Sequence, residues 1–244
     1  MCTVSWLHTP DGYQLLCNRD EKRTRRPAEA PRVFGDGDIR YLAPVDGDYG
    51  GTWISANEFG ISICLLNGSP SNRRASADEN VSRGRLVTAV AKARTAWEAT
   101  DQVNAMDLSK FAPFQLVAIG VERPVMMVAW DGQNAVTHVD SDKRMPLVSS
   151  SVDPAGVLEF RRERFKKLLS STDSVDGVLL FQFHQSHTGL YPDAYSPCMH
   201  REDAETVSFS WVKVSPSAVE FFYSPSAPCR WTPGVTTTIE RRST

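Results

Sequence analysis

The stretch CTVSWLHTPDGYQLLCNRDE, residues 2–21, has the pattern of a β-hairpin. Residues 2–7 roughly alternate between apolar and polar side chains, as in a half-buried strand, and residues 13–17 are again apolar. Between them, Thr9-Pro10-Asp11-Gly12 supplies residues typical of a turn. A hairpin returns the chain beside its own beginning, so we expect Asn18-Arg19-Asp20-Glu21 to lie close to Cys2.

Cys2 is the candidate nucleophile of the chain. Removal of Met1 would leave a thiol and an α-amine on one residue, with unperturbed pKa values of about 8.5 and about 8. Proton exchange between them is then nearly isoenergetic at neutral pH, which suits general-base activation of the sulfur. The alternative is that Cys2 is a small apolar residue at the start of a strand, because cysteine is often buried without a chemical role.

Several short motifs follow one another along the chain. They are Met1-Cys2-Thr3, Asn18-Arg19-Asp20-Glu21, Gly50-Gly51-Thr52-Trp53, Arg83-Gly84-Arg85-Leu86-Val87 and Cys198-Met199-His200-Arg201. In this order and spacing they resemble the motifs of the NRDE family, also called the transport and Golgi organisation family. The resemblance covers nearly the whole chain and implies the fold of N-terminal-nucleophile hydrolases. It also implies an association with haem and lipid handling, although fold is inherited more safely than activity.

A second, more distant similarity concerns the catalytic groups. Residues 57–61, with Asn67 after them, are similar to a stretch of the choloylglycine hydrolase and penicillin V acylase group. This similarity implies that Asn67 stabilises the oxyanion and that Arg19 and Asp20 lie against the cysteine and its amine. Asn18 is a candidate substrate contact. The residue order differs from that group, so which residue of 18–21 faces the sulfur stays open. The alternative for these charges is a solvated turn after a strand.

The remaining strands are predicted from alternating or continuous apolar patterns. Residues 52–56 and 61–66 form a second hairpin, whose far end carries Asn67. Further strands are predicted at residues 114–119, 125–130, 134–139, 206–214 and 219–223. The first three of these form an antiparallel meander.

Three segments have the pattern of helices. The first begins near Ser82 and has one apolar face, made by Leu86, Val90, Ala93 and Trp97. The second begins at Asp153-Pro154 and runs to about Ser170, with one amphipathic face made by Leu158, Arg161, Phe165, Leu168 and Leu169. The third includes residues 178–183. Sheet and helix blocks therefore alternate as in an α+β, four-layer αββα sandwich of two antiparallel sheets. The polar residues 69–82 between the second hairpin and the first helix are interpreted as a lid or binding element, with disorder as the alternative.

Composition indicates an ordinary globular protein. The chain has 244 residues, 41% of them hydrophobic and 23% charged, which is consistent with one domain over residues 1–244. Its net charge of −2 gives no reason to expect a nucleic-acid partner. An apolar stretch of about 18 residues is lacking, so we expect no integral membrane segment. The odd number of cysteines, 5, fits a reducing compartment, and we expect a cytoplasmic protein.

Two short motifs contain potential metal ligands. His184 and His187 have a spacing that a helix could turn into a pair of ligands, but no carboxylate or cysteine completes the set nearby. Cys198-Met199-His200 contains soft ligands that could suggest haem, but consecutive residues of a strand point to alternate faces. We therefore expect neither a metal nor a cofactor. Arg201, the next residue, is a candidate cationic contact to the substrate.

Two functions are compatible with these observations. In the first, the chain is a cysteine N-terminal-nucleophile hydrolase or acyl-transfer enzyme, in which Cys2 attacks a linear amide or thioester and Asn67 holds the oxyanion. In the second, a non-catalytic carrier or chaperone of the same fold binds a hydrophobic ligand such as haem or an acyl chain. The expected partner is a small molecule in both cases, and the sequence indicates no oligomeric state.

Overall fold

The first hairpin forms the centre of a six-stranded antiparallel sheet. The computed structural model describes residues 2–35, 37–68, 81–172, 174–189, 193–230 and 232–242. In spatial order the strands of this sheet are β10 (Leu147–Ser149), β1 (Cys2–Thr9), β2 (Gly12–Lys22), β11 (Ala204–Val214), β12 (Ala218–Ser224) and β13 (Val235–Glu240). The predicted N-terminal hairpin is thus confirmed, with a strand added on each side of it.

A second, seven-stranded sheet is an antiparallel meander in which each strand pairs with the next along the chain. Its strands are β3 (Glu29–Phe34), β4 (Tyr41–Val45), β5 (Ile54–Asn57), β6 (Ser62–Asn67), β7 (Phe114–Ile119), β8 (Met126–Trp130) and β9 (Ala135–His138). The predicted second hairpin, β5–β6, and the predicted three-strand meander, β7–β8–β9, both lie here.

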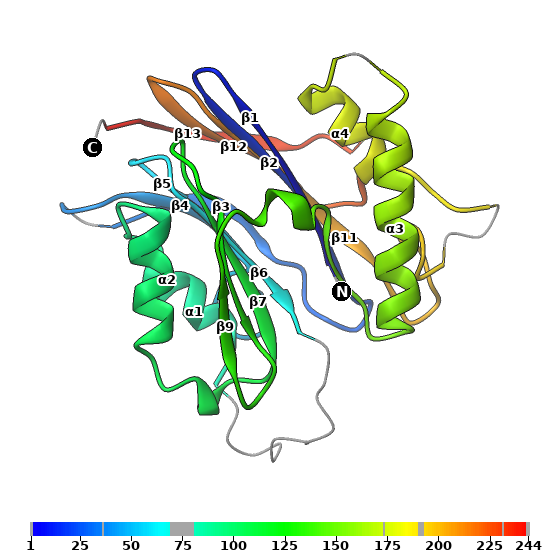
Figure 1. Cartoon of the computed structure of the whole chain (residues 1–244), viewed down its shortest axis with the longest axis horizontal. Helices are drawn as coiled ribbons and strands as arrows, with labels where there is room; N and C mark the ends of the chain where they lie inside the picture. Colours follow the sequence, from blue (N-terminus) through cyan, green and yellow to red (C-terminus); the bar gives the residue numbers. More distant parts are fainter. Residues whose placement is uncertain are drawn as a thin grey trace.

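The helices cover the outer faces of the two sheets. They are α1 (Gly84–Val90), α2 (Ala96–Asn104), α3 (Pro154–Leu169) and α4 (Gly177–His184), with short 3₁₀ helices η1 (Leu108–Lys110), η2 (Ser141–Arg144) and η3 (Pro228–Arg230). Figure 1 shows α1 and α2 beside the seven-stranded sheet and α3 and α4 beside the six-stranded sheet. One apolar cluster lies between the sheets, and others lie under each helix pair. The expected α+β, four-layer arrangement is confirmed.

Alternation along β1 separates two environments. Val4 and Trp6 belong to the apolar cluster between the two sheets. Thr3 and Ser5 point to the opposite face, where Thr3 accepts a hydrogen bond from Arg161 and Ser5 lies 2.8 Å from His184 Nε2. Because side chains of a strand point alternately to its two faces, Cys2 shares the inter-sheet face with Val4 and packs against the same cluster.

The predicted helix from Ser82 is wrong in its length, because the chain forms two helices there. The first ends at Val90, and the second begins after the N-cap Thr95, whose side chain accepts a hydrogen bond from the backbone of Glu98. Buried Asn57 holds the break, since its amide donates to the carbonyls of Ala91 and Ala93 at 2.9 and 2.7 Å. Trp97, which was expected on the buried face, is 49% exposed.

Strands β3, β4, β10 and β13 have no counterpart among the predicted elements. β3 and β4 each contain a proline, Pro31 and Pro44, which weakens the pattern of a strand. β10 has only 3 residues, and β13 is mostly exposed threonine and charge. These strands are stabilised mainly by pairing with neighbouring strands, and their own sequences contribute little to their formation.

The predicted lid segment at residues 69–82 lies outside the described residues except for Val81 and Ser82. Cys17 and Cys64 are fully buried between the sheets, with their sulfur atoms 3.8 Å apart. Over the described residues, no helix is long and apolar enough to cross a bilayer.

Candidate functional site

The first hairpin brings the predicted nucleophile and its charged neighbours together. Cys2 pairs with Arg19 across β1 and β2, and with Ser149 on β10. A cavity of about 370 Å³ opens here, and Cys2, Arg19, Asp20 and Asn67 all contribute to its wall. We call it the Cys2 cavity. The four residues predicted as catalytic therefore line one space, although they come from three strands.

The Cys2 thiol is neutral at physiological pH in this environment. Burial raises its pKa to about 12; the positive charge of the amino terminus opposes that rise, and the nearby Asp20 carboxylate adds to it. A thiol with so high a pKa is a poor nucleophile on its own, because the thiolate is the reactive form. Attack by Cys2 therefore requires a base within reach of the sulfur, and the nearly isoenergetic proton exchange expected from unperturbed pKa values does not hold in this environment.

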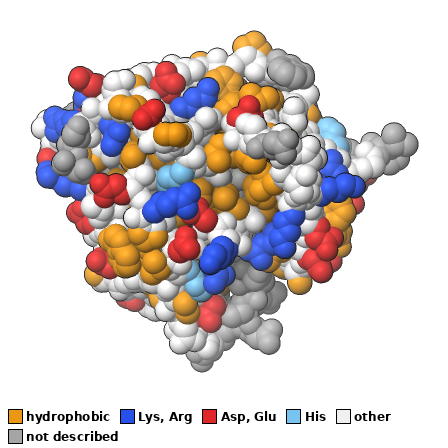
Figure 2. Space-filling model, turned by 45° about the horizontal axis from the view of Figure 1, so that its top comes forward, with side chains coloured by type: hydrophobic (Ala, Val, Ile, Leu, Met, Phe, Trp, Pro, Cys, Tyr) orange, Lys and Arg blue, Asp and Glu red, His pale blue; other side chains and the backbone are white. Residues whose placement is uncertain are grey.

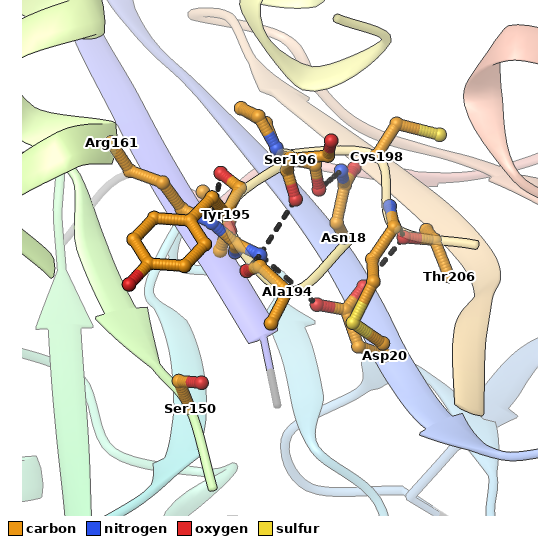
Figure 3. A network of polar contacts seen from close by, with 12 residues as sticks. Asn18, Asp20, Ser150, Arg161, Ala194, Tyr195, Ser196, Cys198 and Thr206 are labelled. Atoms are coloured by element: carbon orange, nitrogen blue, oxygen red, sulfur yellow. Dashed lines mark hydrogen bonds and ion pairs between the residues drawn. The ribbon is translucent and has the colours of Figure 1, made fainter. Parts of the chain in front are cut away.

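Asp20 is a buried carboxylate held in place by a hydroxyl and a guanidinium. Thr206 Oγ1 donates a hydrogen bond of 2.6 Å to Asp20 Oδ1, and Arg161 Nη2 lies 3.9 Å from Oδ2 (Figure 3). Burial raises the pKa of Asp20, while the charge of Arg161 and the Thr206 hydrogen bond oppose that rise.

Arg161 is a cation with no exposure to solvent, and it reaches Asp20 from α3. Its Nη2 donates to the carbonyls of Ala194 and Ser196 at 2.8 and 2.6 Å, and Nη1 donates to the Thr3 hydroxyl. These contacts fix the guanidinium between the segment before β11 and the sheet. The sequence contained a signal for this role, because Arg161 falls on the predicted apolar face of the helix, where a charge is unexpected.

Arg19 forms part of the cavity wall, with its charge already paired. Its guanidinium carbon lies 4.3 Å from the centroid of the Trp53 ring, and Nη2 donates to Asp46 Oδ2 at 2.5 Å. Arg25 donates to both carboxylate oxygens of Asp46 at 2.8 Å. Asp46 therefore joins two arginines on one side of the cavity, and neither its role nor that of Trp53 was foreseen from the sequence.

Asn67 is the last residue of β6 and is exposed. Strand alternation places it on the same face as Leu65, which also lines the Cys2 cavity. Its proposed contact with an oxyanion stays a prediction.

Asn18 and Arg201 lie elsewhere, since the described lining of the Cys2 cavity contains neither. Asn18 is fully buried on the helix-covered face of β2, where its Nδ2 donates to the carbonyls of His184 and Pro197, both at 2.8 Å. Arg201 lies in the turn before β11 and pairs with Asp203 at 2.8 Å. The structure does not bring these two predicted substrate contacts to the cavity.

Two glycines bring a further arginine to the site. A Cβ on Gly84 would lie 2.9 Å from Thr52 N, and one on Gly51 would lie 3.0 Å from the carbonyl carbon of Gly84. This close approach joins two of the motifs and places Arg83 on the cavity wall, where burial lowers its pKa and the Glu21 carboxylate opposes the change. Arg83 Nη1 also donates to the Pro113 carbonyl at 2.9 Å.

The two histidines considered as a ligand pair occupy different places. His184 is buried between Ser5 and Asn18, and burial lowers its pKa to about 3. His187 instead lies among groups from other segments, in a cluster whose potential ligand atoms are all within 4.8 Å of one another: His187, Cys198, His200 and Cys229. The expectation that no cysteine completes a ligand set near His187 is therefore wrong, because the fold supplies two.

A second cavity, of about 340 Å³, lies on the helix-covered face of the six-stranded sheet, beside α4. Four aromatic residues form much of its apolar wall, Phe181, Phe209, Trp211 and Phe222, and Lys213 and Glu220 also line it. Figure 2 shows hydrophobic side chains gathered around a hollow on this side of the molecule. We call it the aromatic cavity; it is separate from the Cys2 cavity and far less polar.

Comparison with solved structures places the fold among known hydrolases. The chain is similar to a Caenorhabditis elegans ortholog of N-acylethanolamine-hydrolyzing acid amidase, with a TM-score of 0.59 and 13% identity over 99% of this chain and 100% of that chain. It is similar to penicillin V acylase from Agrobacterium tumefaciens, with a TM-score of 0.56 and 12% identity over 98% and 86%. A variant of conjugated bile acid hydrolase from Clostridium perfringens gives 0.58 and 11% over 98% and 92%.

At these identities the likeness concerns the fold, and it confirms the expected N-terminal-nucleophile hydrolase fold. No curated protein sequence matches the chain. The family model described as Transport and Golgi organisation 2 matches residues 1–223, a range that includes all the motifs described above. The family expected from those motifs is therefore confirmed: the chain belongs to the Transport and Golgi organisation 2 family.

Proposed function

We propose that this protein is an amide hydrolase whose nucleophile is Cys2, exposed as the amino-terminal residue by removal of Met1. The observation that carries the proposal is the Cys2 cavity, in which the sulfur shares one wall with Arg19, Asp20 and Asn67. The fold similarity to a penicillin V acylase and to an N-acylethanolamine-hydrolyzing acid amidase adds support, because the second of these hydrolyses an amide.

The chemistry needs a base, and the α-amine of an amino-terminal Cys2 supplies it. No histidine lines the Cys2 cavity among the described residues, and the thiol pKa of about 12 keeps the sulfur protonated. An amine with an ordinary pKa of about 8 on the same residue can accept the thiol proton over a short distance. Chain processing would therefore switch the site from inert to reactive.

The reaction proceeds in two steps. The α-amine takes the proton from Sγ, the sulfur forms a bond with the amide carbonyl carbon, and the Asn67 amide donates to the resulting oxyanion. The C–N bond then breaks, and the α-ammonium gives its proton to the leaving amine. Water attacks the thioester with the α-amine again as base, the S–C bond breaks, and the proton returns to the sulfur.

Charged neighbours have positioning roles in this proposal. Asp20, fixed by Thr206 and Arg161, faces the α-ammonium and orients it. Arg19 is already paired with Asp46, so it shapes the wall and biases the site toward a negative sulfur. Arg83 is the cation that we expect to contact a polar group of the substrate.

The test compares one protein before and after exposure of Cys2. A removable segment is fused to the amino end, and a protease that leaves Cys2 as the first residue cuts it off. Iodoacetamide labelling followed by mass spectrometry should show Cys2 reacting much faster after cleavage, and faster than Cys17, Cys64, Cys198 and Cys229. Release of amine from a panel of N-acyl amides should begin only after cleavage. Labelling that is unchanged by cleavage would contradict the proposal.

The aromatic cavity favours a second candidate function, the carrier of an acyl chain. Its size and largely apolar wall suit a hydrocarbon ligand, with Lys213 and Glu220 as its charged lining residues, whereas many more charged groups line the Cys2 cavity. A fluorescent long-chain fatty acid should then bind and quench tryptophan emission in wild type, and bind more weakly to Trp211→Phe and Phe222→Ala. Cys2→Ala should leave that affinity unchanged; an affinity that depends on Cys2 and not on Trp211 would exclude the carrier function at this place.

A further inference from the structure

Four potential metal ligands from three separate segments converge at one point. We call this set the His–Cys cluster: His187, Cys198, His200 and Cys229. His187 lies in the turn after α4, Cys198 and His200 precede β11, and Cys229 lies in η3. Ligands so far apart in sequence meet only in the folded chain, which is why the short motifs alone did not reveal the set.

The atoms of the cluster are arranged around one imidazole nitrogen. His200 Nε2 lies 3.6 Å from Cys198 Sγ and 3.2 Å from Cys229 Sγ. The ring of His187 stands edge-on to that of His200, with centroids 5.2 Å apart. A neutral imidazole nitrogen offers one proton or one lone pair, so a single hydrogen bond does not account for two sulfur atoms beside it.

A second observation points to a missing ligand at the same place. His187 Nε2 is buried and has no hydrogen-bond partner among the described residues. Buried polar atoms are nearly always paired, and an orphaned one indicates an ion, a water or a functional role. Here it lies in a group of thiols and imidazoles, which are the ligands that zinc prefers.

The other nitrogen of His200 faces a carboxylate, as in many metal sites. His200 Nδ1 lies 3.5 Å from Glu205 Oε2, and Arg230 Nη2, which pairs with the same carboxylate, lies 3.4 Å from that nitrogen. Glu205 is itself anchored by Arg23 and Arg230, each at 2.7 Å. Histidine ligands of metals commonly direct their second nitrogen to a carboxylate, which fixes the ring and leaves the first nitrogen free to bind.

We propose that the His–Cys cluster binds one Zn²⁺ in a closed, tetrahedral Cys₂His₂ site. Bonds of about 2.0–2.3 Å in a tetrahedron separate ligand atoms by about 3.3–3.8 Å, close to the contacts around His200. Two thiolates and two neutral imidazoles balance the charge of the ion. With four protein ligands no position stays open for a substrate, so the site is structural.

Zinc at this place would fix the segment that holds the buried charges of the Cys2 site. Arg161 binds the carbonyls of Ala194 and Ser196, just before the first cluster cysteine. Just after it, the Met199 backbone and the Asp20 carboxylate both bind Thr206. The cluster lies between these contacts, so it ties residues 194–206 to α4 and η3.

Metal content tests the proposal directly. The untagged, reduced protein, purified without chelator, should contain about one zinc per chain by elemental analysis. Replacement with Co²⁺ should give the intense visible absorption of a tetrahedral ion and a thiolate-to-cobalt charge-transfer band. Both signals should disappear in Cys198→Ser/Cys229→Ser. The matched control is Cys17→Ala/Cys64→Ala, which removes another close pair of sulfur atoms and should keep both signals.

Loss of zinc from the double cysteine variant could also result from misfolding, so two milder variants are tested as well. Glu205→Gln should weaken zinc binding by about 10–100-fold, as expected for loss of an outer carboxylate, and His187→Ala should weaken it more. Circular dichroism verifies that each variant is folded. A folded, reduced wild type that binds no zinc at one equivalent would overturn the proposal, and so would His187→Ala binding zinc as tightly as wild type. A wild type that is isolated under reducing conditions only with a Cys198–Cys229 disulfide would also overturn it.

Discussion

The Cys2 cavity and the His–Cys cluster both contain cysteine sulfur, but they surround it with different partners. Cys2 has a carboxylate and guanidinium groups nearby, and it opens onto a cavity of about 370 Å³. Cys198 is fully buried, and two imidazoles lie within reach of it. The first setting suits a nucleophile that depends on an amine as its base, and the second suits a ligand. Groups supplied by distant segments of the chain therefore determine whether a cysteine suits nucleophilic attack or metal binding.

The two sites are joined by residues 194–206. Carbonyls at the start of this segment hold Arg161, Cys198 and His200 lie in its middle, and Thr206 at its end holds Asp20. Changes at one site can therefore reach the other through a few hydrogen bonds. Variants that alter only one site, or a contact of the shared segment 194–206, therefore test whether the two sites act independently.

The largest effect is expected for Cys2→Ala. Loss of the nucleophile should lower amide hydrolysis by at least about 1000-fold, because groups that act as a unit lose most of their effect when one is removed. The melting temperature should change little, since the residue is only partly buried. Cys64→Ala, a core cysteine in the other sheet, is the control and should retain turnover. Equal activity of Cys2→Ala and wild type would exclude Cys2 as the nucleophile.

Arg161→Met, on α3, is expected to be the most destabilising change among the residues that bind the shared segment 194–206. It leaves the Asp20 carboxylate and several backbone carbonyls buried without their cation, which should lower the unfolding free energy by about 3–5 kcal/mol in urea denaturation. Arg162→Met, on the neighbouring and partly exposed position of α3, should cost less than about 1 kcal/mol. If the two variants were equally stable, the buried contacts of Arg161 would contribute nothing to folding.

Chelation of zinc should lower the stability of the wild type by a smaller amount. Zinc at 100 times its dissociation constant adds about 2.7 kcal/mol to the unfolding free energy, and a chelator removes that contribution. Thermal melting with and without chelator measures it. Cys198→Ser/Cys229→Ser should show no such difference, whereas a chelator effect that persists in this variant would place the zinc elsewhere.

His184 carries a third imidazole, which belongs to neither the Cys2 cavity nor the His–Cys cluster. Burial lowers its pKa from 6.5 to about 3, so the unfolded chain takes up a proton at a higher pH than the folded chain does. The contribution to stability is therefore full above pH 6.5 and is lost as the pH falls toward 3, at about 1.4 kcal/mol per pH unit. Denaturation at several pH values should show a shallower acid slope for His184→Gln than for wild type. Parallel slopes would mean that His184 titrates normally.

The sequence predicted the local elements better than the groups assembled from distant segments. The hairpin, the meander, the family and the layered fold all follow from alternation and from motif order, which are properties of short stretches. Arg161 was assigned to an apolar helix face, because nothing local indicates that carbonyls near residue 195 would surround it. Cys229 is separated from Cys198 by two strands, so no spacing rule could place them together.

Asn18 is the reverse case: it is close to the site in sequence, but its side chain lies away from the cavity. It stands beside Arg19 in the motif, but adjacent residues of a strand face opposite sides, and its amide is used to bind backbone carbonyls under α4. The motif therefore correctly places Asn18 near the end of β2, but its side chain points to the face of the sheet opposite the Cys2 cavity.

The backbone contact between Gly51 and Gly84 has a consequence for altering the specificity of this protein. Main-chain atoms set the spacing of the two segments there, and even a methyl group on either glycine would force them apart. Backbone atoms therefore fix the width of the Cys2 cavity beside these glycines. The polarity of the cavity wall there depends on side chains such as Tyr49 and Arg83. A library designed to change which ligands the Cys2 cavity accepts should vary those two side chains and leave both glycines untouched.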